Sequence, residues 1–198
     1  MSAAAKGRVL VLYAHPVPES FNAAVHRTVV ETLGAKGWEV DDCDLNAEGF
    51  QPVLTMEERR TYHEVPDNID PVKPYVERLR AADALVMVFP VWNFGYPAIL
   101  KGFLDRVFLP DVSFKLEGGG VRPGLTNIRK LYACTTYGGT RMRAWLNGDP
   151  PRKCVTRAVW YACGMPAKRY IALYDMNNNR EPQLKAHLER VRREMEAF

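Results

Sequence analysis

The sequence is poor in the side chains that most enzymes use as nucleophiles or metal ligands. Its 198 residues include four histidines, four cysteines and three serines. No serine lies in a G-x-S-x-G motif, which argues against a serine hydrolase of the nucleophile-elbow type. The cysteines form no C-x-x-C pair, which excludes zinc sites of that spacing and dithiol redox centres. We interpret them as isolated thiols of a cytoplasmic protein, and we expect no metal site.

Long apolar segments and strong charge asymmetry are also lacking. No apolar run reaches the ~18 residues of a membrane span, and residues 1–7 are too few and too polar for a signal peptide. The 27 basic and 23 acidic side chains leave a net charge of +4. This charge is spread thinly and does not form the basic stripe of a nucleic-acid groove. We therefore expect neither membrane insertion nor a nucleic-acid partner.

Strand-like and helix-like segments alternate along the chain. The length favours one domain over residues 1–198. Within it, we expect residues 1–7 to be disordered. Two segments are nearly continuous apolar runs, as in strands buried on both faces of a sheet. The expected strands are 8–14, 38–45, 84–89, 129–135 and 169–174. The expected helices are 22–37, 55–63, one that begins at Asp70, 97–107, 151–163 and 182–197, and residues 108–127 form a loop or small excursion.

This alternation predicts the fold class. Strands that alternate with helices form βαβ units, hence a parallel sheet with helices on both faces. Two doubly wound strand orders are common, and in both the ligand lies beyond the carboxyl ends of the strands. Candidate binding residues should therefore lie in the loops 15–22, 90–96 and 135–149.

The first of these loops could bind a phosphate group. Its position before a helix offers free backbone N–H groups and the positive end of the helix dipole. His15 can donate to an anion, and Ser20 and Asn22 supply polar side chains. Alternatively, Ser20 and Asn22 only cap the helix. No strand is followed by G-x-G-x-x-G, and no G-K-S/T motif occurs, so neither nucleotide fingerprint is present.

Aromatic and small residues mark the other two loops. Residues 90–97 contain three aromatic side chains, which is unusual for a short loop between a strand and a helix. They could line a flat aromatic ligand, or they could form an apolar plug over the end of the sheet. Gly138 and Gly139 allow the backbone to approach a ligand closely, although a pair of glycines is also typical of a plain turn.

Taken together, the three loops make the sequence similar to the flavodoxin-like NAD(P)H:quinone oxidoreductase family. That family includes DT-diaphorase, bacterial quinone reductases and ancillary flavoproteins of potassium-efflux systems. The similarity covers most of residues 8–165 in the same order. The segments that carry it are His15 with Ser20–Asn22, residues 36–40, Asp44–Leu45, the most specific block Phe89–Phe103 with its continuation Asp105–Phe108, and Thr135–Gly139.

The resemblance implies a flavodoxin-like three-layer α/β fold with a five-stranded parallel sheet of order 2-1-3-4-5 and helices on both faces. It implies a reductase that passes hydride from NADH or NADPH through a bound flavin to a quinone, or to a nitro- or azo-aromatic acceptor, in a ping-pong cycle. Family members are dimers, so a homodimer is expected. The alternatives are a regulatory flavoprotein subunit of a potassium-efflux-type transporter and an electron carrier like flavodoxin.

The resemblance also assigns residues to the flavin. The first loop holds its phosphate, the second lines its ring, and the third contacts the ring edge. The residues so assigned are His15, Ser20, Phe21, Asn22, Pro90, Val91, Trp92, Asn93, Phe94, Thr136, Tyr137, Gly138 and Gly139. FAD and FMN both occur among short members, and the segments around Phe21 and Trp38 favour FAD over FMN.

Departures from the family concern the substrate side of the site. Asn147 stands where mammalian members carry a histidine, and Phe114 and Leu116 replace a pair of pocket tyrosines. Tyr137 could hydrogen-bond a reduced substrate and is the candidate catalytic residue, with an ordinary buried tyrosine as the alternative. Arg141 could attract an anionic nicotinamide nucleotide, or it is a solvated surface arginine. Phe114 and Arg141 are the candidate substrate-binding residues.

Overall fold

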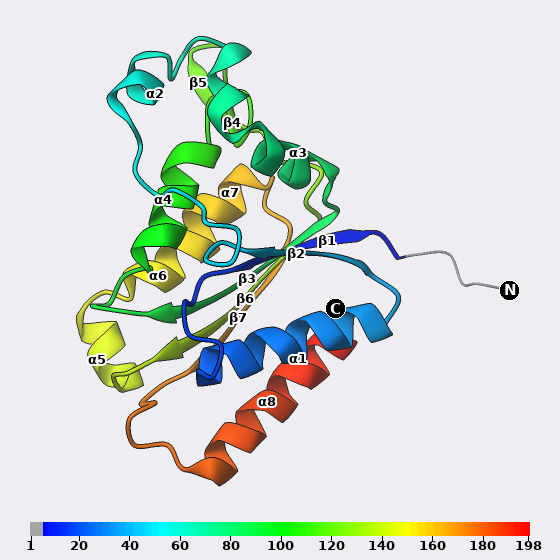
Figure 1. Ribbon diagram of the computed structural model, residues 1–198, viewed down its shortest axis with the longest axis vertical. Coiled ribbons are helices and arrows are strands. Elements are labelled where there is room, and N and C mark those ends of the chain that lie inside the picture. Colours follow the sequence, from blue (N-terminus) through cyan, green and yellow to red (C-terminus); the bar gives the residue numbers. More distant parts are fainter. Residues whose placement is uncertain (1–5) are drawn as a thin grey trace, which may run out of the picture.

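A computed structural model describes residues 6–198 as a parallel five-stranded sheet between two layers of helices (Figure 1). The strand order is β2-β1-β3-β6-β7, and every pairing in this sheet is parallel. Because β4 (Phe114–Glu117) and β5 (Gly120–Pro123) form a separate hairpin, this is the predicted order 2-1-3-4-5, and the flavodoxin-like fold is confirmed. The strands are β1 Arg8–Tyr13, β2 Glu39–Asp44, β3 Ala84–Val91, β6 Lys130–Tyr137 and β7 Ala167–Leu173.

The predicted disorder of residues 1–7 falls mainly outside the described residues, which begin at Lys6. Lys6 and Gly7 lead directly into β1, and the Lys6 backbone N–H donates to the Gly37 carbonyl. Among residues 6–198, no helix combines the length and the apolar character that crossing a bilayer requires.

Alternate residues of the central strands face opposite helical layers. On one face, Val9, Val11 and Val86 pack with α1 (Phe21–Ala35) and α8 (Glu181–Glu196). On the other face, the core includes Leu10, Leu12, Leu85 and Met87 beneath α3 (Lys73–Ala81) and α4 (Ala98–Val107). Burial on both faces explains the continuous apolar runs of β1 and β3, because neither set of alternate side chains meets water.

Three helix starts test the capping predictions. Ser20 caps α1, because its Oγ accepts from the Ala23 backbone N–H at 3.1 Å. Asn22 lies inside the helix and is buried, so the helix does not begin at that residue as predicted. The predicted capping box of Thr55 and Glu58 is confirmed at α2 (Met56–Arg60). The predicted start of the next helix at Asp70 is wrong. A 3-10 helix occupies Asp67–Val72, and α3 begins only at Lys73.

The second half of the chain is less regular than predicted. The excursion at 108–127 contains an antiparallel hairpin of β4 (Phe114–Glu117) and β5 (Gly120–Pro123). The sequence prediction missed α5 (Arg141–Leu146), which Thr140 caps by accepting from the Arg143 N–H at 3.3 Å. The helix expected at 151–163 is interrupted by a π-helical turn. Its parts are α6 Pro150–Lys153, the π turn Cys154–Val159 and α7 Trp160–Ala162.

All four thiols are free, which confirms the interpretation as isolated cysteines. Cys43, Cys134 and Cys163 are buried, and burial raises the pKa of each to about 12. Cys154, in the π-helical turn, is half-buried. Because the thiolate is the reactive form, the three buried cysteines are chemically quiet.

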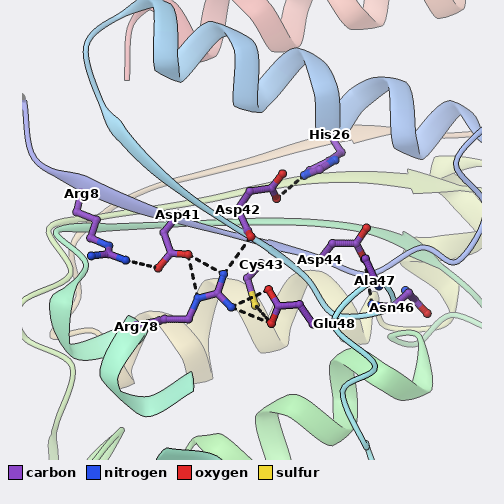
Figure 2. A network of polar contacts seen from close by, with 10 residues as sticks. All are labelled: Arg8, His26, Asp41, Asp42, Cys43, Asp44, Asn46, Ala47, Glu48 and Arg78. Carbon is purple, nitrogen blue, oxygen red and sulfur yellow. Dashed lines mark hydrogen bonds and ion pairs between the residues drawn. The ribbon is translucent and has the colours of Figure 1, made fainter. Parts of the chain in front are cut away.

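A charged network fastens α3 to the edge strand β2 (Figure 2). The Arg78 guanidinium donates to Asp41 at 2.6 and 2.9 Å and to Glu48 at 2.8 Å. Arg8 donates to the second oxygen of Asp41 at 2.9 Å. Burial raises the pKa of Asp41, but the hydrogen bonds from the two arginines outweigh it and hold that pKa below its usual value. The network therefore satisfies a largely buried carboxylate on the edge strand of the sheet.

We predict that His187 in α8 makes the fold sensitive to acid. Its side chain is 5% exposed, and its Nε2 has no hydrogen-bond partner within residues 6–198. Burial, aided by the charge of Arg190, lowers its pKa to about 4. The unfolded chain takes up this proton near pH 6.5, so stability present above that pH is lost as the pH falls toward 4. The expected loss is about 3 kcal/mol.

Urea unfolding at pH 7 and pH 4.5 measures this effect. The variant His187→Leu removes the titrating group and should lose clearly less stability between the two pH values than the wild type. Equal losses in the two proteins would assign the acid sensitivity to other groups.

Candidate functional site

One pocket at the carboxyl edge of the sheet joins the three predicted loops. Its volume is about 280 Å³. Nine of the residues assigned by resemblance line it: His15, Ser20, Phe21, Asn22, Pro90, Val91, Trp92, Thr136 and Gly138. We call this the loop pocket. It forms because β1, β3 and β6 are parallel neighbours, which brings the loops after them to the same edge.

The first loop contributes hydrogen-bonding groups from His15 and Asn22. His15 Nδ1 accepts from the Val17 backbone N–H at 3.0 Å, which leaves Nε2 to carry the ring proton. Burial lowers the pKa of His15, so the neutral ring with one N–H donor is favoured at pH 7. Asn22 is 3% exposed and donates from Nδ2 to Thr136 Oγ1 at 3.3 Å.

The side-chain oxygen of Asn22 has no hydrogen-bond partner in the described part of the chain. Its Oδ1 atom is buried and accepts no hydrogen bond within residues 6–198. A buried acceptor without a donor is costly, typically about 1–3 kcal/mol. Since Asn22 lines the loop pocket, a ligand hydroxyl placed there would satisfy this oxygen.

The second loop is a tight turn that presents an aromatic side chain. Trp92 and Gly95 exchange two backbone hydrogen bonds, of 2.8 and 3.2 Å. Between them, Asn93 and Phe94 have positive φ angles of 48° and 55°, the pattern of a type I′ turn. The turn leaves the Trp92 side chain 45% exposed, with its ring centroid 5.6 Å from that of His15.

The third loop contacts the second. Phe94 Cζ lies 3.7 Å from the point that a Cβ on Gly139 would occupy. Asn93, Phe94 and Gly139 do not line the loop pocket themselves. Phe94 instead packs beside Gly139, against the backbone that follows β6.

Tyr137 uses its hydroxyl inside the protein. The side chain is 1% exposed, and the hydroxyl donates to Asp149 Oδ1 at 2.7 Å and lies 2.7 Å from the Tyr170 hydroxyl. Burial raises the pKa of Tyr137, with further contributions from Tyr170 and Asp149. Tyr137 is not among the residues that line the loop pocket, and its assignment as a catalytic residue stays a prediction.

The two candidate substrate residues lie in other cavities. Phe114 lines an apolar cavity of about 320 Å³ with Val121 of the same hairpin and Ala162. Arg141 lines a separate pocket of about 400 Å³ beside α5 and α6. The structure therefore does not bring Phe114 or Arg141 into the loop pocket.

Sequence reasoning missed Met176 and Asn177, which complete the lining of the loop pocket. They follow β7, and the Met176 backbone N–H donates to the Tyr137 carbonyl at 3.0 Å. The signal was available, because a run of three asparagines, residues 177–179, follows the fifth strand. The sequence prediction includes only the loops after the first, third and fourth strands, whereas Met176 and Asn177 follow the fifth.

Comparison with known proteins places the chain in a family. Residues 7–195 match the family described as having a flavodoxin-like fold. A curated rat protein, ribosyldihydronicotinamide dehydrogenase (quinone), is 30% identical over 160 residues, which is 72% of this chain and 69% of the relative. The chain belongs to the flavodoxin-like quinone reductase family. A second rat relative, NAD(P)H dehydrogenase (quinone) 1, is 30% identical over 151 residues, or 68% of this chain.

The chain matches only about half of the longer relatives in this quinone reductase family. The match covers 55% of rat NAD(P)H dehydrogenase (quinone) 1. Among solved structures, Smu.1420 from Streptococcus mutans UA159 superposes with a TM-score of 0.85 at 28% identity, covering 96% of this chain and all of that one. The shared architecture therefore extends over nearly the entire chain.

Proposed function

We propose that the protein is an NAD(P)H-dependent flavin oxidoreductase that reduces quinones or nitro- or azo-aromatic compounds. The observation that carries the proposal is the loop pocket. There, the edge of the sheet brings together a neutral histidine donor, an exposed indole and the unpaired Asn22 acceptor. Membership of the quinone reductase family supports the same activity.

The residues of the loop pocket fit a flavin. A phosphate group would accept from the His15 Nε2–H and the Ser20 hydroxyl beside the start of α1. A ribityl hydroxyl would donate to Asn22 Oδ1, the buried acceptor that lacks a partner. The ring would lie against Val91 and Trp92. When bound, the flavin supplies two-electron redox chemistry, and the chain supplies binding, orientation and shielding from water.

We propose FAD as the flavin. The support is the similarity of Phe21 and Asn22 to the FAD-binding members of the family. Trp38 gives no support, because it precedes β2 at the amino edge of the sheet, opposite the loop pocket. Its ring packs against that of Phe198, with 5.1 Å between the ring centroids. Six residues of strand separate the two edges by about 20 Å. The flavin that is released on heating, identified by mass, distinguishes FAD from FMN.

We also propose that the chain forms one domain and assembles as a homodimer in the cytoplasm. The support is the resemblance to the quinone reductase family, whose members are dimers. Sedimentation of the flavin-loaded protein gives the oligomeric state directly, and a monomer at micromolar concentration would contradict the dimer.

The predicted effect of Asn22→Leu tests the site. Leucine keeps the branched shape of the side chain and removes both polar groups, so the affinity for flavin should fall tenfold or more, about 1.4 kcal/mol. Thr28→Val is the matched control, because it removes a buried hydroxyl of α1 that bonds the Ala24 carbonyl outside the pocket. The absorbance at ~450 nm that remains after dialysis measures the bound flavin.

The activity has its own test. Mixing the flavin-loaded wild type with NADH or NADPH should bleach the ~450 nm band. A loaded protein that neither nucleotide bleaches would refute the proposed activity. Unchanged flavin retention in Asn22→Leu would refute only the placement of the flavin.

A further inference from the structure

A basic pocket lies next to the loop pocket, on the side of the edge strand β7. Its volume is about 400 Å³, and its lining residues come from α5, α6, the π turn and the segment that follows β7. Figure 1 shows α5, α6 and β7 on the same side of the molecule. The residues that line this basic pocket are Arg141, Trp145, Gly148, Asp149, Arg152, Lys153, Thr156, Arg157 and Tyr174. Four of them are cationic and one is acidic, so the lining carries a net charge of 4 − 1 = +3.

The single carboxylate already has its partners. Asp149 Oδ1 accepts from the Tyr137 hydroxyl at 2.7 Å, and Oδ2 accepts from Arg152 Nε at 2.9 Å. Arg152 also donates to the Tyr174 hydroxyl at 2.7 Å, and its guanidinium lies 4.2 Å from the centre of the Tyr170 ring. These contacts fix Arg152 in the wall of the basic pocket and neutralise it.

The other three cations remain available. Arg141, Lys153 and Arg157 are exposed and form no ion pair within residues 6–198. The Lys153 Nζ lies 3.5 Å from the point that a Cβ on Gly148 would occupy, so the ammonium reaches over that glycine. Three like charges around one pocket repel one another, and a bound polyanion would relieve that repulsion.

An aromatic surface lies beside these charges. The Trp145 side chain is 73% exposed in α5, although tryptophan is highly buried on average. An exposed indole offers a face on which a purine base can stack, as bases stack on aromatic side chains in nucleic-acid complexes. Cations beside an exposed aromatic ring are the groups that would bind the phosphates and the base of a nucleotide.

The basic pocket is connected to the proposed flavin site. The helix α5 follows Gly138 and Gly139 directly and is capped by Thr140. The Tyr137–Asp149 hydrogen bond joins the end of β6 to the wall of the basic pocket. A dinucleotide whose nicotinamide reaches the loop pocket could therefore extend its other half along α5.

We propose that the basic pocket binds the ADP half of the donor nucleotide and gives the enzyme a preference for NADPH over NADH. This proposal rests on the proposed function. The three available cations bind the phosphates, and Trp145 stacks with the adenine. NADH presents two phosphate charges, whereas the 2′-phosphate of NADPH adds roughly 1.5 to 2 more. This additional negative charge is what would make a pocket with three available cations bind NADPH more tightly than NADH.

Titration calorimetry with 2′,5′-ADP tests the pocket on the flavin-loaded wild type. Lys153→Gln and Arg157→Gln should each weaken binding about fivefold or more, and Trp145→Ala should weaken it by a similar factor. Arg60→Gln is the matched control, because Arg60 is an exposed arginine of α2 far along the chain from the pocket. The same charge variants should lower kcat/KM for NADPH more than for NADH.

Competition separates the possible results. Inhibition by 2′,5′-ADP that is competitive with NADPH would support the proposal. Binding without competition would overturn the assignment to the donor, and equal binding by Arg157→Gln and the wild type would overturn the site itself. Because calorimetry needs no turnover, a protein that binds 2′,5′-ADP in this pocket but is not bleached by NADPH would contradict only the reductase activity.

Discussion

Gly102→Ala is expected to destabilise the fold by about 3 kcal/mol. Gly102 lies in α4, where an added Cβ would be 2.2 Å from the Pro52 carbonyl oxygen and 2.5 Å from Pro52 Cα. Backbone cannot rotate away as a flexible side chain does, so either the helix or the loop at Pro52 must shift. This strain exceeds the gain of about 1 kcal/mol that alanine normally brings to a helix interior. Urea unfolding at pH 7 measures the difference.

Gly34→Ala is the matched control for this prediction. Gly34 also lies in a helix, α1, but nothing is within 4 Å of its added Cβ. The substitution should therefore stabilise the protein by about 0.5–1 kcal/mol, through helix propensity and a less flexible unfolded chain. If both variants changed stability in the same direction, close packing at Pro52 would not be what distinguishes Gly102.

Arg78→Gln is expected to destabilise the fold by about 3 kcal/mol. The Arg78 and Asp41 side chains are only 20% and 10% exposed. Removing the guanidinium leaves the Asp41 carboxylate with Arg8 alone and removes the tie to Glu48 (Figure 2). Loss of a partner from a largely buried ion pair leaves a charge without sufficient compensation, which explains the size of the effect.

Arg129→Gln tests the role of burial in that result. Arg129 donates to Asp83 at 2.7 Å, but the two side chains are 70% and 37% exposed. An exposed pair of this kind contributes less than about 1 kcal/mol. Equal losses for Arg78→Gln and Arg129→Gln, measured by urea unfolding, would show that burial does not determine the strength of these pairs.

The sheet could be predicted from the sequence because its signals are local. The apolar runs of β1 and β3 result from burial on both faces, and the capping box at Thr55 depends on residues three positions apart. The π-helical turn at Cys154–Val159 and the start of α3 at Lys73 could not be predicted in this way. Their geometry depends on packing against elements distant in sequence, and no local pattern records that packing.

The binding loops were predictable in location but not in the direction of each side chain. Parallel strands bring the loops after β1, β3 and β6 to one edge, so nine assigned residues meet in the loop pocket. Tyr137 differs because β6 extends through it, and its side chain turns inward to Asp149. Phe114 lies elsewhere because the hairpin of β4 and β5 carries it to a separate cavity.

Because three of the four cysteines are buried, the fourth, Cys154, is a natural attachment point for probes. With a pKa of about 12, each of Cys43, Cys134 and Cys163 is ionised to only about one part in 10⁵ at pH 7. The half-buried Cys154 borders both the apolar cavity of Phe114 and a second cavity beside Tyr96. A maleimide dye or spin label would therefore mark this one position in the unmutated protein, in the cavity that Phe114 and Val121 of the β4–β5 hairpin also line.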